Sequence, residues 1–231
     1  MIKYKNISLA DRVFDDLEKK ILNGTYPRGM LLSESKLCEE LDVSRTPVRE
    51  AIRRLIDEDL VEEQSNGLLV LGMTDEDMKD IYEIKKRVES VAVGRAALVV
   101  TDEQLKTLRD ILDQADYYAM KGDHEKVRDF DTQFHDTIYD CCGSRVYRNV
   151  LKTIHHKVMR YRKASLSSHE SRITESVAEH RAIYNALAAH DQKQAEQAMK
   201  THAEHALASV LEAQENGAAQ DNAGASPSSG N

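Results

Sequence analysis

Apolar residues recur every three or four positions along most of this chain, which is the spacing of amphipathic helices. Between Met73 and Glu212 there is no proline, and the only glycines are Gly94, Gly122 and Gly143. This stretch is also rich in Ala, Leu, Glu and Lys, which favour the helical backbone. It therefore predicts a run of six helices, without strands.

The first 73 residues have a different pattern, in which three amphipathic helices are followed by a hairpin. Ser8 and Ser33 each precede a helical apolar pattern and are typical helix-capping residues. A third helix begins around Pro47, since proline is well tolerated in the first turn. Asn66-Gly67 stands between two short apolar runs, which indicates a β-hairpin. Helices in this order, followed by a hairpin, predict a winged helix-turn-helix.

The two patterns divide the chain into domains and predict a mainly α fold. Residues 1–73 are predicted to form the winged helix-turn-helix, and residues 74–215 an all-helical domain. The tail, residues 216–231, consists mostly of Gly, Ala, Ser, Asn and Gln. Because these residues cannot bury enough apolar area to fold, we expect the tail to be disordered.

The overall charge argues at first sight against nucleic-acid binding. The chain has 32 Lys and Arg residues against 40 Asp and Glu residues, for a net charge of −8. It has no apolar stretch of the about 20 residues that a membrane span needs, and no apolar leader at its start. Its three cysteines form no CxxC pair. We therefore expect a cytoplasmic protein that does not enter membranes.

One segment departs from this acidity. Ser44–Arg54 contains four arginines and one glutamate, so its local charge is +3, whereas residues 1–73 as a whole carry −3. On the third helix, Thr46, Arg49 and Arg53 share an arc away from the apolar face. Arginine can reach guanine edges, and serine or threonine hydroxyls can hold phosphates. The segment is either a solvated cationic face or a DNA-reading surface, which would have low non-specific affinity because so few cations are present.

The N-terminal sequence carries a set of motifs in five segments, which are Ile21–Gly24, Pro27–Leu32, Ser33–Leu37, Val43–Ala51 and Leu55–Val61. In these segments it resembles the GntR family of bacterial transcription regulators. This resemblance implies that Arg45, Thr46 and Arg49 contact DNA and that Gly67 lies at the tip of the wing. Asp59 stands where the family usually has Gly, at a position that often needs a left-handed backbone. The full set of predicted DNA contacts is Ser35, Ser44, Arg45, Thr46, Arg49, Arg53 and Gly67.

Polar side chains interrupt the apolar faces of three later helices. Asp131 and His135 are four residues apart and therefore share one face, which also carries apolar residues. His180 and His202 each lie within the apolar stripe of a further helix. Unpaired polar groups are expensive in a core, and a shared divalent cation would explain all four. We predict that these four residues bind Zn²⁺, with Ni²⁺ or Mn²⁺ as alternatives.

The remaining histidines are assigned to less buried positions. His205, three residues after His202, competes for the place of fourth ligand but sits at the edge of its stripe. A single histidine in a core usually has a structural role, so structural histidines are an alternative to the metal site. The histidines expected at the surface or its boundary are His124, His155, His156, His169 and His190.

The stretch from Asp75 to Leu211 carries a characteristic set of residues, which are Glu89, Asp131, Phe134-His135, Glu179-His180 and His202. With these residues it resembles the FCD effector domain of FadR-type GntR regulators. This resemblance implies an antiparallel helical bundle around a metal-centred pocket for a small carboxylate, with Asp131 and three histidines as ligands. Four residues before Glu89 the family commonly has an arginine, whereas this chain has Lys85, a point charge rather than a fork. The predicted effector-binding cations are Lys85, Arg160 and Arg172, with Arg162 as a further candidate.

The sequence therefore predicts a homodimeric regulator whose operator binding is controlled by a small carboxylate at a metal site. A dimer would place two recognition helices in successive major grooves of a palindromic operator. One alternative is a metal-dependent enzyme, a hydrolase or an oxygenase, in which Glu179 is a weak candidate for the general base. The other is a helical interaction protein whose histidines are structural.

Overall fold

The computed structural model describes the backbone of residues 8–164 and 170–224, and the side chains of residues 8–162 and 172–212. The N-terminal unit ends at Thr74 and the C-terminal unit begins at Asp75. This division lies one residue after the predicted boundary. Within the part of the chain that the structure describes, no helix is long and apolar enough to cross a membrane.

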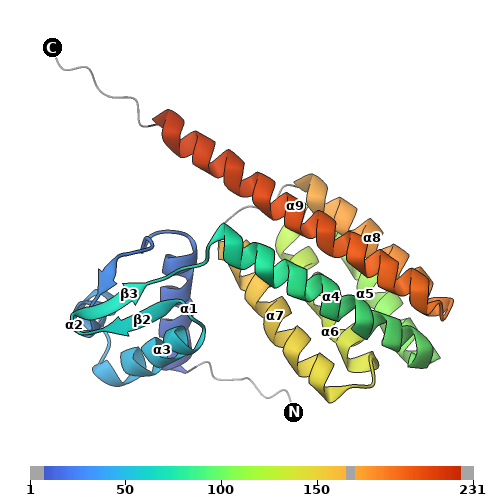
Figure 1. Ribbon diagram of the computed structural model, residues 1–231, viewed down its shortest axis with the longest axis horizontal. Helices are drawn as coiled ribbons and strands as arrows, with labels where there is room; N and C mark the ends of the chain where they lie inside the picture. Colours follow the sequence, from blue (N-terminus) through green and yellow to red (C-terminus); the bar gives the residue numbers. More distant parts are fainter. Residues whose placement is uncertain (1–7, 165–169, 225–231) are drawn as a thin grey trace. The chain divides into compact units, whose positions relative to one another are not determined.

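The N-terminal unit is a helix-turn-helix followed by a small sheet (Figure 1). Ser8 forms the predicted N-cap of the first helix in a capping box with Asp11, and Ser33 accepts a hydrogen bond from the backbone N–H of Lys36 at the start of the second. Apolar faces of the first and third helices form the core together with the sheet. The elements are α1 (Leu9–Leu22), β1 (Leu31–Leu32), α2 (Glu34–Leu41), α3 (Arg45–Asp57), β2 (Val61–Gln64) and β3 (Gly67–Val70).

The wing is a three-stranded antiparallel sheet in the order β1-β3-β2. Gln64 pairs with Gly67, so the tight turn lies at Ser65 and Asn66, one residue before the predicted position. Gly67 instead begins β3 with φ +144°, and a Cβ there would lie 2.6 Å from the carbonyl oxygen of Leu32 in β1. The glycine is therefore needed because β1 approaches closely, and β1 itself was not predicted.

Asp59 has the left-handed backbone expected at the end of the recognition helix, with φ +57°. Its N–H donates to the carbonyl of Ile56, and the next N–H, of Leu60, donates to that of Leu55. These two bonds end α3 and turn the chain towards β2. Aspartate tolerates this conformation less well than glycine, so the family's usual residue is replaced here at some cost in stability.

The C-terminal unit is a helical bundle (Figure 1). Its helices are α4 (Asp75–Val99), α5 (Asp102–Met120), α6 (His124–Cys141), α7 (Arg145–Ala164), α8 (Glu170–Ala188) and α9 (Gln192–Gly224). Thr101 and Gln104 form the predicted capping box at the start of α5. The mainly α fold, with a winged helix-turn-helix and a helical second domain, is confirmed.

The prediction of a disordered tail is wrong for residues 216–224, because α9 continues to Gly224. Alanine, which most favours the helical backbone, occurs three times in that segment. The rest of the predicted tail, residues 225–231, lies outside the described residues.

The core of the bundle lies between α4, α5, α6, α8 and α9. Helices α4 and α9 pack closely at Gly94, where a Cβ would lie 2.6 Å from the Cγ of Glu196. Phe134, Ile138 and Ile183 are fully buried in this core. The predicted metal ligands pack against this core. The ring centroids of Phe134 and His180, for example, are 4.7 Å apart.

Candidate metal centre and DNA-binding surface

Three of the predicted metal ligands come together from three helices. His135 of α6, His180 of α8 and His202 of α9 are each at most 5% exposed. One ring nitrogen of each lies within 4.8 Å of one ring nitrogen of the other two. The apolar stripes that carried these histidines in the sequence therefore do converge on one place in the bundle.

Asp131 of α6 lies at the edge of this group. Its Oδ1 is 3.6 Å from Nε2 of His180, and its Oδ2 is 3.5 Å from Nε2 of His155. The side chain of Asp131 is 12% exposed, so it lies between the buried imidazoles and the surface. Asp131 thus faces two histidines, one that was predicted as a ligand and one that was not.

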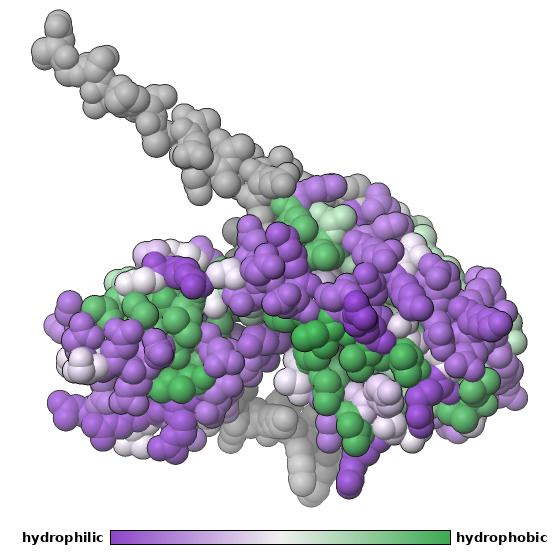
Figure 2. All heavy atoms as spheres, viewed as in Figure 1, coloured by the Kyte–Doolittle hydropathy of each residue, from purple (hydrophilic) through white to green (hydrophobic). Residues whose placement is uncertain are grey.

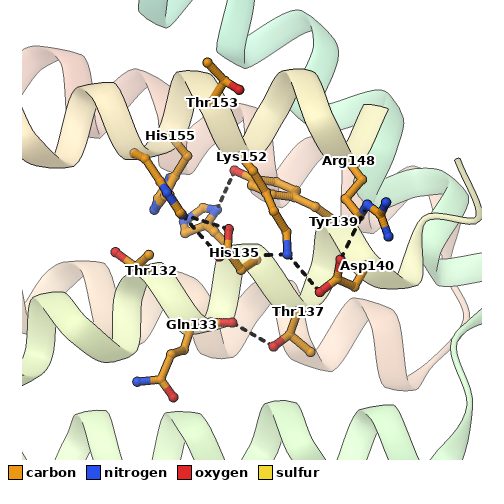
Figure 3. Close-up of polar contacts among 12 residues, drawn as sticks. Thr132, Gln133, His135, Thr137, Tyr139, Asp140, Arg148, Lys152, Thr153 and His155 are labelled. Carbon is orange, nitrogen blue, oxygen red and sulfur yellow. Dashed lines mark hydrogen bonds and ion pairs between the residues drawn. The ribbon is translucent and has the colours of Figure 1, made fainter. Parts of the chain in front are cut away.

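The expectation that His155 lies at the surface or its boundary is wrong, because its side chain is 2% exposed. Figure 3 shows His155 of α7 and His135 of α6 pointing toward each other, and their ring centroids are 4.5 Å apart. A signal for this burial was present in the sequence. Leu151 and Val158, four residues before and three residues after His155, are both buried on the same face of α7.

Carboxylates orient two of the histidine rings. Nδ1 of His135 is 2.7 Å from Oε1 of Glu89, and Nδ1 of His202 is 2.7 Å from Oε2 of Glu179. Such a pairing holds the ring proton on Nδ1 and leaves the lone pair of Nε2 for a ligand. The same arrangement is typical of histidines that bind metals.

Both carboxylates are themselves held by several donors. Glu89 is fully buried, where it accepts from Lys85 at 2.6 Å and from the hydroxyl of Tyr139. Glu179 accepts both arms of the Arg172 guanidinium, each at 2.7 Å. These bonds fix the two carboxylates and so fix the imidazoles that they orient.

The electrostatics keep three of the imidazoles, those of His135, His155 and His180, neutral. Burial lowers the pKa of His135, His155 and His180 well below the ordinary value, and neighbouring positive groups lower each of them further. Burial alone raises the pKa of Glu89, but Lys85 and the other donors outweigh it and the net pKa is lowered. Neutral imidazoles and ionised carboxylates are the protonation states that bind divalent cations.

The residues present fit a divalent cation. Nε2 of His135, Nε2 of His180 and both ring nitrogens of His155 are buried without a hydrogen-bond partner among the described residues. A buried polar atom without a partner costs about 1–3 kcal/mol. Nε2 of His135 and Nε2 of His180 belong to residues that form one close group with His202, so a shared cation would satisfy both. Imidazole nitrogen and carboxylate oxygen suit Zn²⁺, Ni²⁺ and Mn²⁺.

The predicted effector-binding cations lie in three different places. Lys85 and Arg162 line a cavity of about 10 Å³ beside the histidines, together with Tyr82. Arg160 lines another pocket, which it shares with acidic residues of α6. Arg172 is buried in its pair with Glu179. Lys85 and Arg162 therefore line the cavity beside the histidines, whereas Arg160 lines a different pocket.

The predicted DNA contacts form an exposed group on the N-terminal unit. Ser44 is the N-cap of α3, and its hydroxyl makes no capping hydrogen bond. Nε of Arg49 donates to Oε2 of Glu34 at 2.8 Å, and Nε of Arg45 is 3.8 Å from Oε1 of the same residue. Glu34, at the start of α2, was not predicted as part of this surface. The exposed side chains are those of Ser35, Ser44, Arg45, Thr46, Arg49 and Arg53, while Gly67 is half-buried.

A winged helix-turn-helix joined to a helical domain is an architecture typical of DNA-binding transcription regulators. Residues 9–68 match the bacterial regulatory proteins of the gntR family, and residues 80–205 match the FCD domain. The chain therefore belongs to the GntR family and carries an FCD domain, as its sequence motifs indicated.

Individual relatives agree with this assignment. The chain is 32% identical over 131 residues to the gluconate operon transcriptional repressor of Bacillus licheniformis, a match that covers 57% of this chain. It spans only about half of that repressor, 54% of its length. It is 29% identical over 203 residues to the regulator LutR of Bacillus subtilis, covering 79% of this chain and 92% of LutR.

Solved structures show the same fold. A chain from Rhodococcus sp. RHA1, assigned as a GntR transcriptional regulator, is 30% identical with a TM-score of 0.63, covering 87% of this chain and 97% of the other. E. coli McbR is 22% identical with a TM-score of 0.68, covering 90% and 99%. These families and relatives are transcriptional regulators and not enzymes, so the metalloenzyme alternative has no support.

Proposed function

We propose that this GntR regulator binds a palindromic operator as a homodimer, and that a small carboxylate at a divalent-metal site in its FCD domain controls the binding. The observation that carries the proposal is the convergence of His135, His180 and His202 beside Asp131. The Nε2 atoms of His135 and His180 are buried without a hydrogen-bond partner among the described residues. The exposed arginines at the N-terminus of α3 support operator binding.

The DNA-binding surface would read bases with few cations. Arg45, Thr46 and Arg49 project from the first turns of α3, where a recognition helix meets the major groove. Glu34 neutralises part of their charge, and the chain as a whole carries −8. We therefore expect specific binding to depend on these few side chains and on dimer symmetry, and non-specific binding to be weak.

A homodimer is supported by exposed apolar residues on the FCD domain. Ile84, Val91 and Leu98 are 42–59% exposed and lie seven residues apart, so they share one face of α4. Val146 and Val150 are exposed on α7. Figure 2 shows hydrophobic residues gathered over these two helices on the face in view. A two-fold pairing through such a face would match the symmetry of a palindromic site.

The metal would be held by Asp131, His135, His180 and His202. A bound divalent cation would supply a positive charge and a position for a carboxylate oxygen. Lys85, Arg162 and Tyr82 line the small cavity beside it and would bind the rest of the ligand. Because the cavity holds only about one water molecule, a larger ligand must stabilise a more open form of the domain.

The proposal is tested by metal analysis combined with ligand screening. Purified and dialysed protein should contain about one divalent metal per chain, and small carboxylates should raise its melting temperature only when the metal is present. Operator duplexes selected from a random pool then report whether the same carboxylates change DNA affinity. Protein that neither contains nor binds metal would refute the metal site, while carboxylate binding without metal would refute its role in ligand binding.

A further inference from the structure

We propose that Glu34 is a positioning residue for base readout, whose carboxylate holds the Arg49 guanidinium in one orientation and limits its contacts with DNA phosphates. The inference rests on the operator binding of the proposed function and adds a residue to the DNA-binding surface. Glu34 was not among the predicted DNA contacts, since a carboxylate in such a place is expected only to repel DNA.

The carboxylate of Glu34 lies between the two arginines at the start of the recognition helix. Glu34 is the first residue of α2, and its side chain reaches the first turns of α3. Its Oε2 accepts from Nε of Arg49 at 2.8 Å, and its Oε1 lies 3.8 Å from Nε of Arg45. Each oxygen of one carboxylate therefore faces one of the arginines predicted to read bases.

The contact with Arg49 uses one edge of the guanidinium and does not occupy the other. Nε donates to Glu34, whereas a bidentate contact with guanine needs two parallel N–H groups, which the terminal Nη atoms supply. The side chain of Arg49 is still 65% exposed in this pair, so its terminal edge is accessible to DNA. Because its rotamers are already restricted, Arg49 loses less conformational entropy when it binds a base.

The same contact opposes binding to phosphates at random. The hydrogen bond from Arg49 lowers the pKa of Glu34, so the carboxylate is ionised at neutral pH and repels phosphates. An arginine without a partner can turn to whichever phosphate is nearest. Arg49, with Nε held by Glu34, offers its Nη groups in one direction only. The pair therefore penalises contacts with phosphates more than a contact with one correctly placed guanine.

The test is a double-mutant cycle that combines Glu34→Gln with Arg49→Ala. For each protein, affinities are measured across salt concentrations for an operator that the wild type selects from a random pool and for a duplex of unrelated sequence. The readout is the ratio of the two affinities, because the loss of a negative charge alone would raise both equally. Melting temperatures should be unchanged by Glu34→Gln, since an exposed ion pair contributes little to stability.

Glu39→Gln is the matched control. Glu39 is exposed on the same helix, so its replacement changes the net charge of the protein by the same amount. Five residues along a helix turn a side chain by about 140° around the axis, so Glu39 lies on a different face of α2 from Glu34. Any effect of charge alone on DNA affinity is therefore measured by this variant.

We expect Glu34→Gln to bind unrelated DNA more tightly and the operator no more tightly than the wild type does. One additional phosphate contact steepens the dependence of log affinity on log salt concentration by about 0.9, which amounts to roughly eightfold at about 0.1 M salt. The affinity ratio should therefore fall roughly eightfold. In the Arg49→Ala background the ratio should not respond to Glu34→Gln, and Glu39→Gln should leave the wild-type ratio unchanged.

Three results would overturn the proposal. The first is an unchanged affinity ratio in Glu34→Gln, and the second is an equal fall of the ratio in Glu39→Gln. The third is an equal effect of Glu34→Gln in the Arg49→Ala background, which would show that Glu34 does not act through Arg49. A wild-type protein that selects no sequence from the random pool would instead refute the operator binding of the proposed function, and the role of Glu34 with it.

Discussion

Replacing Gly67 with alanine should weaken the wing strongly, because two separate costs meet at this position. Its φ of +144° is one that residues with a side chain rarely adopt, which costs about 1–3 kcal/mol. In addition, the new Cβ would lie 2.6 Å from the carbonyl oxygen of Leu32. A backbone atom in a sheet cannot move away as a flexible side chain would, so we expect a total cost of about 2–4 kcal/mol.

Gly29→Ala is the matched control. Gly29 also has a left-handed backbone, with φ +85°, but no atom of the described residues lies within 4 Å of a Cβ placed there. This variant therefore carries the backbone cost without the close contact. Part of that cost is offset because alanine restricts the unfolded chain, so we expect a loss of about 1 kcal/mol or less.

Hydrogen exchange of backbone amides, followed by mass spectrometry of peptides, measures the effect locally. A loss of 2 kcal/mol corresponds to a roughly 30-fold faster exchange of β3 amides. Peptides from α5, in the other unit, should be unchanged in both variants. The reasoning is wrong if Gly67→Ala accelerates the exchange of β3 no more than Gly29→Ala does.

Two further predictions concern the DNA-binding surface and the candidate metal centre, and a third concerns a buried cysteine of the bundle core. Arg49→Ala should lower the affinity for an operator selected in vitro at least roughly tenfold, because arginine reads guanine in a bidentate manner. The melting temperature should not change. Equal operator affinity of variant and wild type in an anisotropy titration would contradict this prediction. In the wild type, Oε2 of Glu179 lies 2.7 Å from Nδ1 of His202 and orients its ring. Glu179→Gln weakens this contact and should lower the metal affinity roughly 10- to 100-fold. Unchanged metal affinity in a chelator competition would argue against this role of Glu179. Burial raises the pKa of Cys141 from 9.0 to about 11. Because iodoacetamide reacts with the thiolate, Cys141 should resist alkylation at pH 8 and react as the pH approaches 11. Half-buried Cys38 should react first, and rapid alkylation of Cys141 at pH 8 would show that this burial is not maintained in solution.

Much of the local structure was predictable because it depends on neighbouring residues. The cap at Ser8 and the hairpin near Gly67 involve residues within a few positions of each other. The register of the turn was not predictable in the same way. A glycine is needed at position 67 because the carbonyl of Leu32 in β1 approaches it closely. The strand β1 has only two residues and forms by pairing with β3, so the sequence pattern did not indicate it.

The candidate metal centre was also predictable only where it depends on residues close together in the sequence. Asp131 and His135 could be placed together from their spacing, and the apolar stripes around His180 and His202 pointed inward. His155 was missed because no second polar residue on α7 marks it as a partner of the others, although its apolar neighbours indicate burial. Pairings across helices, such as Nδ1 of His202 with Glu179, depend on helix packing that the sequence pattern does not contain.

The position of Glu89 on α4 has a mechanical consequence. Glu89 accepts from Nδ1 of His135 in α6, and α4 begins at Asp75, the residue that follows the DNA-binding unit in the chain. The uninterrupted helix between Asp75 and Glu89 is about 21 Å long at 1.5 Å per residue, so it acts as a lever arm. A tilt of about 5° at Glu89 displaces the start of α4 by about 2 Å. A small movement of the buried imidazole of His135 would therefore be amplified at Asp75, where the C-terminal unit begins.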